Sequence, residues 1–313
     1  MLFLFISVLA SSTMSIVIRF GQDRTKTTYS TLAVNYLTCI ICSLCFLGEG
    51  GIIPSLPKTN IALALGAFNG SVYLISLALQ QYSIKKNGVV FPSVFSKIGG
   101  LMIPIFVSVL FFGEKPALLQ IIGSVFAAAA IIIMSRREDK QAVQSLSSLF
   151  LLFFIEGIAS VMSKIFEETG SSALATHFIL YTFSTAFILC TALVLYKKER
   201  PGIWELVCGV AIGIPNYFAT RLLLRALRSV PAVIAYPVRS AGCILVVALA
   251  GLCLFHERLS KKQWCAIAMV ILAVVLLSNR VGGWLLVSQP TSLGTVHTGL
   301  VHGSSPVYAT DLL

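Results

Sequence analysis

Apolar stretches of about 20 residues recur along this chain, separated by short polar connections. Each stretch is long enough to cross the hydrocarbon core of a bilayer as an α-helix, which takes about 20 mainly apolar residues. The pattern therefore predicts an all-α, polytopic membrane protein with ten transmembrane helices. The ten segments, accurate to a few residues at each end, are 2–20, 29–47, 60–81, 88–112, 117–135, 147–165, 173–196, 203–227, 231–255 and 263–279.

One connection near the middle of the chain differs from the others because it carries many charged residues. We therefore expect a first five-helix unit over residues 1–135, a charged linker over 136–146 and a second five-helix unit over 147–280. Residues 281–313 turn to Gly, Ser, Thr, Pro and His and contain no apolar run of membrane-spanning length. This composition predicts a polar, mostly disordered C-terminal tail.

The two halves of the chain resemble each other in sequence. Residues 112–115 read Phe-Gly-Glu-Lys and match residues 255–258, which read Phe-His-Glu-Arg. Residues 32–36 match residues 174–178 at nearly the same offset. Because five is an odd number, the second half must enter the membrane from the opposite face, so we expect two inverted five-helix repeats. In three of four matched loop pairs the Lys and Arg residues are concentrated in one member, as this inversion requires.

These features together resemble a known transporter family, the EamA branch of the drug/metabolite transporter superfamily. That family has paired five-helix halves, each with a small-residue-rich fourth helix and a Gly/His-Glu-Lys/Arg turn before its last helix. Residues 226–232, Ala-Leu-Arg-Ser-Val-Pro-Ala, also resemble the family's usual entry into the ninth helix. The resemblance covers residues 1–280 and implies a carrier in the cell (inner) membrane. The chain departs from the family at His256, where Gly is usual, and in the first helix, which lacks the customary aromatic–Gly pair.

The composition narrows the partners that such a chain can have. It is 57% hydrophobic and 11% charged, with a formal net charge of +11. Its Lys and Arg lie mostly between apolar runs and form no basic face, which favours anionic lipid headgroups over nucleic acid as partners. Cys39, Cys42 and Cys45 imitate iron–sulfur spacing, but they lie on a continuous apolar helix without a further ligand. We therefore expect no metal and no cofactor.

Ionisable side chains inside the apolar segments are candidates for function, because each costs about 2.5–3.5 kcal/mol at mid-helix. Arg239 and Lys97 lie three and two residues before the matched glycines Gly242 and Gly99, so we expect both cations at comparable depth. Together they would bind a carboxylate or phosphate. In the alternative, Glu156 neutralises one of them and their long stems reach the membrane interface. The full set is Lys97, Glu156, His177, Arg221 and Arg239.

Glu156 is also a candidate for proton coupling, because desolvation inside a membrane disfavours the charged carboxylate. Small multidrug resistance carriers, which belong to the same superfamily, use a carboxylate in their first helix for this purpose. The aligned position in the first half of this chain is Val8. A structural salt bridge from Glu156 to Lys97, Arg221 or Arg239 is the alternative.

Uncharged polar and aromatic residues supply further candidates for a site near the middle of the membrane. The amide and imidazole candidates are Asn35 with His177 at matched positions, and Asn69 with Asn216 at nearly matched ones; the aromatic candidates are Tyr73 and Tyr236. Interhelical hydrogen bonds and packing explain these residues as well. Glu114 and Glu257 lie in short turns before a helix, where we expect each to interact with the N-terminal helix dipole and to be structural.

No enzyme motif accompanies these residues: the chain has no His-Glu-x-x-His, no Gly-x-Ser-x-Gly and no phosphate loop. We therefore predict a secondary-active transporter, not an enzyme. It exports a small metabolite, such as an amino acid or a related anionic or zwitterionic compound, by alternating access. A nucleotide-sugar or phosphate-ester antiporter stays open as an alternative, as does a channel or lipid scramblase. Assembly as a homodimer stays open too.

The distribution of basic residues predicts the orientation. Loops after odd-numbered helices hold fourteen Lys and Arg residues and the other face holds six. This asymmetry places both termini outside, whereas ten-helix members of the superfamily are usually drawn with both termini in the cytoplasm. On a cysteine-free background in intact cells, we expect an impermeant thiol reagent to label a cysteine at Ser304 and not one at Ser145. Labelling at 145 but not at 304 would reverse the assignment.

Overall fold

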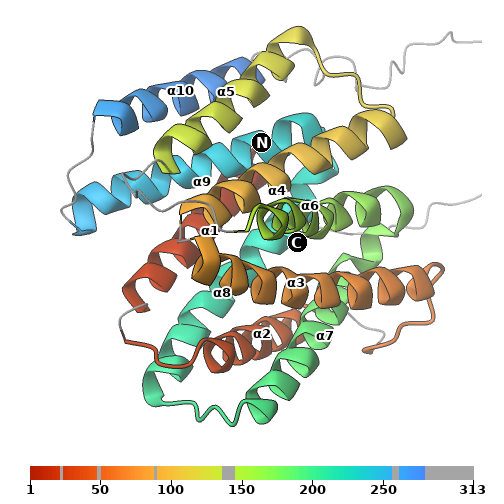
Figure 1. Cartoon of the computed structure of the whole chain (residues 1–313). Coiled ribbons are helices and arrows are strands. Elements are labelled where there is room, and N and C mark those ends of the chain that lie inside the picture. Colours follow the sequence, from red (N-terminus) through yellow and green to blue (C-terminus); the bar gives the residue numbers. More distant parts are fainter. Residues whose placement is uncertain (22–23, 48–50, 88–89, 136–144, 256–260, 279–313) are drawn as a thin grey trace, which may run out of the picture. The chain divides into compact units, whose positions relative to one another are not determined.

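The computed structural model describes residues 1–278 except for the short segments 22–23, 48–50, 88–89, 136–144 and 256–260. This part of the chain is all-helical, and no strand occurs in it. The predicted tail, Glu257 and His256 lie outside the described residues. The ten α-helices of the described part are α1 (Leu2–Gly21), α2 (Thr28–Cys45), α3 (Thr59–Asn87), α4 (Val90–Phe111), α5 (Leu118–Ser135), α6 (Leu146–Thr169), α7 (Ala175–Tyr196), α8 (Ile203–Leu227), α9 (Ala232–Phe255) and α10 (Lys261–Ser278), with a short 3₁₀ helix, η1 (Ser172–Leu174), before α7 (Figure 1).

The helices coincide with the predicted segments except at the end of α3, which continues to Asn87 instead of ending near residue 81. Side chains in this polar extension bind the start of α6. The Asn87 amide accepts a hydrogen bond from the backbone N–H of Ser145 (2.8 Å) and donates one to its carbonyl (3.2 Å). Tertiary contacts therefore extend the helix beyond its apolar run.

Six of the described helices are long and apolar enough to cross a membrane: α2, α3, α6, α7 together with η1, α8 and α9. The other four, α1, α4, α5 and α10, contain apolar stretches of 10–17 residues. Large apolar side chains are exposed on many helices, including Phe106 in α4, Ile188 in α7 and Ile271 in α10. Such an apolar surface is unfavourable in contact with water and is suited to contact with lipid tails.

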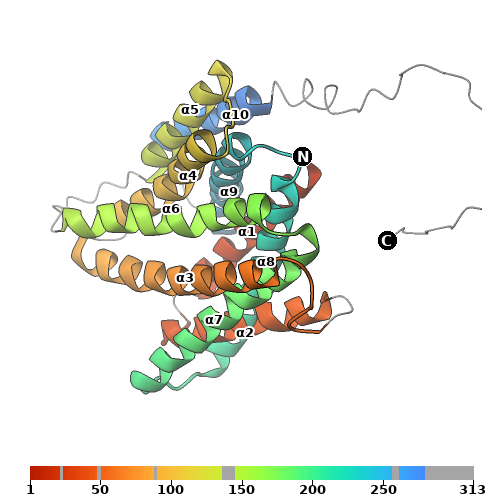
Figure 2. The same ribbon diagram turned by 90° about the vertical axis from the view of Figure 1, so that its right-hand side faces the viewer.

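Helices of the first half pack mainly against helices of the second half. The α1 helix packs on α8 and α9, and α6 packs on α3 and α4. The α2 helix contacts both α7 and α8, while α3 contacts α7. The α5 and α10 helices pair with each other, away from α2 and α7, in both views (Figures 1 and 2). The two halves are thus interleaved within one helical bundle.

Contacts between helix ends define two faces of the bundle. On one, which we name the first face, Arg228 after α8 donates to the carbonyl of Ser172 before α7 (2.9 Å). The starts of α3 and α9 and the end of α6 also lie there. On the opposite, second face, the N–H of Ser30 at the start of α2 donates to Glu199 after α7 (3.0 Å). Consecutive helices therefore run in alternating directions between the two faces.

Glycines allow α3 to approach α7 and α8 to approach α2. A Cβ atom added to Gly70 would lie 2.4 Å from the carbonyl oxygen of Thr182, and one added to Gly213 would lie 2.5 Å from Cβ of Thr38. Such distances are far inside van der Waals contact, so these backbones can meet only where a side chain is absent. Close packing through small residues is a main source of helix association in lipid.

We expect Gly70→Ala and Gly213→Ala each to destabilise the folded protein by roughly 1–3 kcal/mol, because an added methyl group must displace a neighbouring helix. Thermal unfolding of the detergent-purified protein measures this change. Ala64→Val, on an exposed face of α3, adds more volume without meeting a neighbour and serves as the control. Equal melting temperatures for all three variants would contradict the tight-packing explanation.

Candidate functional site

Ionisable side chains from three helices gather around Tyr73 of α3. Tyr73 interacts electrostatically with Arg239 of α9 and with Glu156 of α6. Tyr236 of α9 interacts with Arg239 and Tyr73, and Tyr36 of α2 interacts with Tyr73 and Glu156. We name these five residues the central cluster. It combines a cation, an anion and three phenol hydroxyls, and it draws on both halves of the chain.

Glu156 is held between α3 and α4. The Ser76 hydroxyl of α3 donates a hydrogen bond to its Oε1 atom at 2.6 Å, and the Ser96 side chain of α4 also lies near the carboxylate. Lys97 of α4 is exposed and acts on Glu156 through electrostatics. Among the described residues, every ion pair within 4.0 Å involves Lys164, so Glu156 is held by hydroxyl groups rather than by a direct salt bridge.

Arg239 has an unused hydrogen-bond donor inside the protein. Its Nη2 atom donates to the Ser11 hydroxyl of α1 at 3.2 Å. Its Nε atom is buried and has no hydrogen-bond partner among the described residues. A buried donor without a partner is costly, so this N–H is well placed to bind an anionic ligand. Nearby, Tyr236 donates to the carbonyl of Ser160 at 2.7 Å, which ties α9 to α6.

The asparagine candidates link pairs of helices. Asn216 of α8 donates to the Oδ1 atom of Asn35 in α2 at 3.2 Å. Asn69 of α3 is 3.5 Å from the hydroxyl of Thr182 in α7. Gly70 of α3 packs against the backbone of Thr182, as Gly213 of α8 packs against that of Asn35. These contacts match Asn35 with Thr182, whereas the sequence comparison aligned Asn35 with His177. Asn35 Nδ2 and Asn69 Oδ1 are buried without partners in the described part of the chain.

Arg221 and His177 have their contacts outside the central cluster. Arg221 donates to the hydroxyl of Tyr217 at 2.6 Å, and its guanidinium lies 4.4 Å from the ring centroid of Phe46, just after α2. His177 Nε2 is 3.2 Å from the carbonyl oxygen of Gly51. The structure therefore brings together Arg239, Glu156, Tyr73 and Tyr236 from the predicted set, with Lys97 beside them, and places Arg221 and His177 elsewhere.

Sequence reasoning missed Tyr36 and the three serines that bind the charged groups. Ser76 lies three residues after Tyr73, so both occupy one face of α3, and this spacing was a usable signal. Tyr36 follows the recognised candidate Asn35 directly. Ser11 and Ser96 carried no comparable signal, because a serine in an apolar helix most often bonds to its own backbone.

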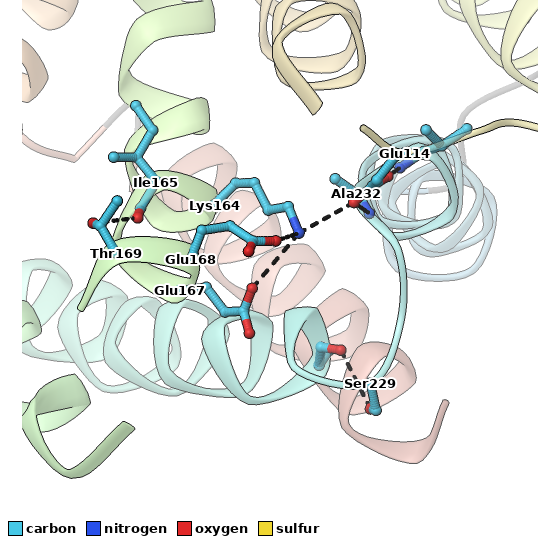
Figure 3. A network of polar contacts seen from close by, with 10 residues as sticks. Glu114, Lys164, Ile165, Glu167, Glu168, Thr169, Ser229 and Ala232 are labelled. Carbon is cyan, nitrogen blue, oxygen red and sulfur yellow. Dashed lines mark hydrogen bonds and ion pairs between the residues drawn. The ribbon is translucent and has the colours of Figure 1, made fainter. Parts of the chain in front are cut away.

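Glu114 has a structural role, but not the predicted one. We expected it to interact with the helix that follows it, α5. Instead its two oxygens accept the N–H groups of Ala232 (3.0 Å) and Val233 (3.1 Å) and cap the start of α9. Lys164 of α6 holds the same carboxylate at 3.1 Å and also pairs with Glu167 and Glu168 (Figure 3). This network thus joins both halves of the chain on the first face.

Comparisons with known proteins identify relatives of this chain. Residues 145–279 match the EamA-like transporter family. An uncharacterized protein of Haemophilus influenzae is 24% identical over 284 residues, which are 87% of this chain and 95% of that protein. A crystal structure of another protein, 14% identical in sequence, shares the fold with a TM-score of 0.66 over 90% of this chain and 97% of that chain.

A shorter relative matches one part of the chain at higher identity. The probable 4-amino-4-deoxy-L-arabinose-phosphoundecaprenol flippase subunit ArnE of Escherichia coli is 33% identical over 92 residues, which are 29% of this chain and 78% of the subunit. Its counterpart in Shigella flexneri is 36% identical over 93 residues, 29% of this chain and 79% of that subunit. The chain therefore belongs to the EamA-like transporter family of the drug/metabolite transporter superfamily, and it is a multi-pass membrane transporter.

Proposed function

We propose that this protein is a secondary-active transporter of the cell (inner) membrane that exports a small zwitterionic or anionic metabolite, such as an amino acid, by alternating access. The observation that carries this proposal is the central cluster, in which Tyr73 is within electrostatic range of both the cation Arg239 and the anion Glu156. Two opposite charges around one phenol suit a substrate that itself carries both charges. Anionic lipid headgroups around the basic loops complete the expected environment.

The proposed architecture has ten crossing helices in two inverted repeats, and the packing pattern supports it. In such repeats, each helix of one half corresponds to the helix five places away in the other half. The contacts of α1 with α8 and α9 then correspond to those of α6 with α3 and α4, and both sets are present. In the same way, the contact of α3 with α7 corresponds to that of α8 with α2. The glycines at these crossings, Gly66 with Gly209 and Gly70 with Gly213, share one offset of 143 residues.

Arg239 is the proposed anion-binding residue. Its unpartnered Nε and its planar guanidinium can donate two parallel hydrogen bonds to a carboxylate. Glu156, fixed by Ser76 and Ser96, is oriented to attract an ammonium group or to carry a proton. Tyr73 and Tyr236 then offer hydroxyl groups and ring surface between the two charged ends of the substrate.

The location of the cluster suits alternating access. Tyr73 belongs to the first half, whereas Glu156 and Arg239 belong to the second, so the substrate would be bound where helices of the two repeats meet. Coupling to a proton at Glu156 would provide the driving force. Neutralising this carboxylate removes its attraction for an ammonium group, which links proton binding to substrate release.

The similarity to a flippase subunit favours one alternative. That subunit's substrate, as its name states, is an amino sugar linked through phosphate to undecaprenol, and its amine and phosphate would also fit a Glu–Arg pair. The similarity extends over 29% of this chain. A thermal-shift screen against amino acids, nucleobases and phosphorylated metabolites would separate the two functions, because a soluble metabolite stabilises a metabolite carrier and not a flippase.

We expect Arg239→Met to weaken binding of the anionic or zwitterionic substrate by about 10- to 100-fold, because a hydrogen bond to a charged group contributes roughly 1.5–3 kcal/mol. Folded yield should fall much less. Substrate titration of purified protein measures the change, and Arg225→Met, at an exposed position of α8, is the matched control. Unchanged binding in Arg239→Met would exclude Arg239 from the site.

We expect Glu156→Gln to abolish gradient-driven transport in proteoliposomes while substrate exchange continues, because glutamine keeps the shape and polarity of the side chain but cannot carry the proton. Glu168→Gln, at an exposed position on the same helix, should leave both activities intact. Loss of both activities together with folded yield in Glu156→Gln would instead assign Glu156 a structural role.

A further inference from the structure

A concave site lies on the first face, beside the Lys164 network. It is a pocket of about 170 Å³ between the end of α6, the start of α7 and the end of α8. Phe166 and Leu224 give it apolar walls, while Glu167 and Arg228 give it one charge of each sign. Each water molecule takes up about 30 Å³ in the liquid, and it contains one heavy atom. A pocket of this volume therefore has room for about half a dozen small heavy atoms. This volume is sufficient for the charged head of an amino acid.

Glu167 is the least neutralised acid next to this pocket. Three carboxylates surround one buried ammonium: Lys164 Nζ lies 3.1 Å from Glu114, 2.5 Å from Glu168 and 3.6 Å from Glu167. Glu114 is neutralised further by the two N–H groups at the start of α9. Glu167 has the longest ion pair, and it is the acid that lines the pocket. Of the three carboxylates, Glu167 is therefore the one that Lys164 neutralises least.

Arg228 supplies the opposite charge and is oriented by the backbone. Its Nη2 atom donates to the carbonyl of Ser172 at 2.9 Å, and its side chain interacts electrostatically with Glu167. A guanidinium has five N–H donors, so this one bond leaves donors for a carboxylate or phosphate. Arg228 is exposed, which makes it accessible from the membrane surface.

We infer that this pocket binds the head of a zwitterion, with an ammonium group at Glu167 and a carboxylate or phosphate at Arg228. The ammonium supplies the positive charge that three carboxylates around one lysine require. The carbon atoms between the two charges contact Phe166 and Leu224. This site is separate from the central cluster, and its occupancy does not depend on whether the central cluster carries out transport.

Two ligands share this chemistry at a membrane surface. One is a free metabolite with neighbouring amino and acidic groups, and the other is the phosphoethanolamine headgroup of a lipid. Both present an ammonium a few bonds from an anion. The experiment therefore uses a soluble zwitterion as the probe and lets lipid composition distinguish the two sources.

Binding of L-alanine and O-phosphoethanolamine to the full-length protein carrying Arg239→Met measures the pocket without the proposed central site. We expect binding that weakens by about tenfold or more in Glu167→Gln and in Arg228→Gln, the loss of one charge-assisted contact. Thr169→Ala and Arg225→Gln, polar neighbours on the same two helices that do not line the pocket, should leave binding unchanged. Acetate and methylammonium, with one charge each, should bind at least tenfold more weakly.

Failure to bind either probe, acetate binding as strong as that of L-alanine, or equal effects of all four substitutions would overturn the inference. Alanine binding that requires Arg239 and ignores Glu167 and Arg228 would also overturn it, while supporting the central site. In nanodiscs, weaker alanine binding with phosphatidylethanolamine than with phosphatidylglycerol identifies the lipid headgroup as occupant. Equal binding in both identifies a free metabolite.

Discussion

The close approach of α3 to α7 and of α8 to α2 is the contact on which the arrangement of the bundle depends. In lipid there is no hydrophobic driving force that brings apolar helices together. Helix pairing therefore depends on the places where glycine lets two backbones approach closely. Tyr73 lies less than one turn after Gly70, and Asn216 less than one turn after Gly213. The depth at which the central cluster and the Asn35–Asn216 hydrogen bond sit therefore follows directly from these two crossings.

Carboxylates perform two different tasks in this structure. At the two faces they accept hydrogen bonds from backbone N–H groups near helix starts. Glu114 binds the start of α9 in this way. Glu205 binds Lys26 and Thr27 just before α2, and Glu199 binds the first turn of α2. These groups would otherwise have no partner within their helix. Glu156 is bound instead by serine hydroxyls inside the bundle. A carboxylate bound by hydroxyls alone keeps more freedom to exchange a proton than one that caps a helix.

The positions of the helices could be predicted from sequence because the length of an apolar run is a local property. Part of the central cluster was predictable for a similar reason, since Arg239 and Glu156 are costly in lipid wherever they point. Long-range register was not predictable. The sequence aligned Asn35 with His177, yet the glycine crossings place Thr182 there, and no local pattern reveals that Glu114 reaches a helix 118 residues further on. Arg221 shows the same limit, because its stacking on Phe46 depends on how α2 and α8 pack.

The cap on α9 has a kinetic consequence. The start of α9 is bound by a carboxylate from the first half of the chain, and Lys164 holds that carboxylate in place. A movement that separates α9 from the turn before α5 must break both hydrogen bonds to this carboxylate in one step. At roughly 1.5–3 kcal/mol for each hydrogen bond to a charged group, their loss adds about 3–6 kcal/mol to the activation barrier, which slows that step by about 10²- to 10⁴-fold. A step with such a barrier has a steep temperature dependence.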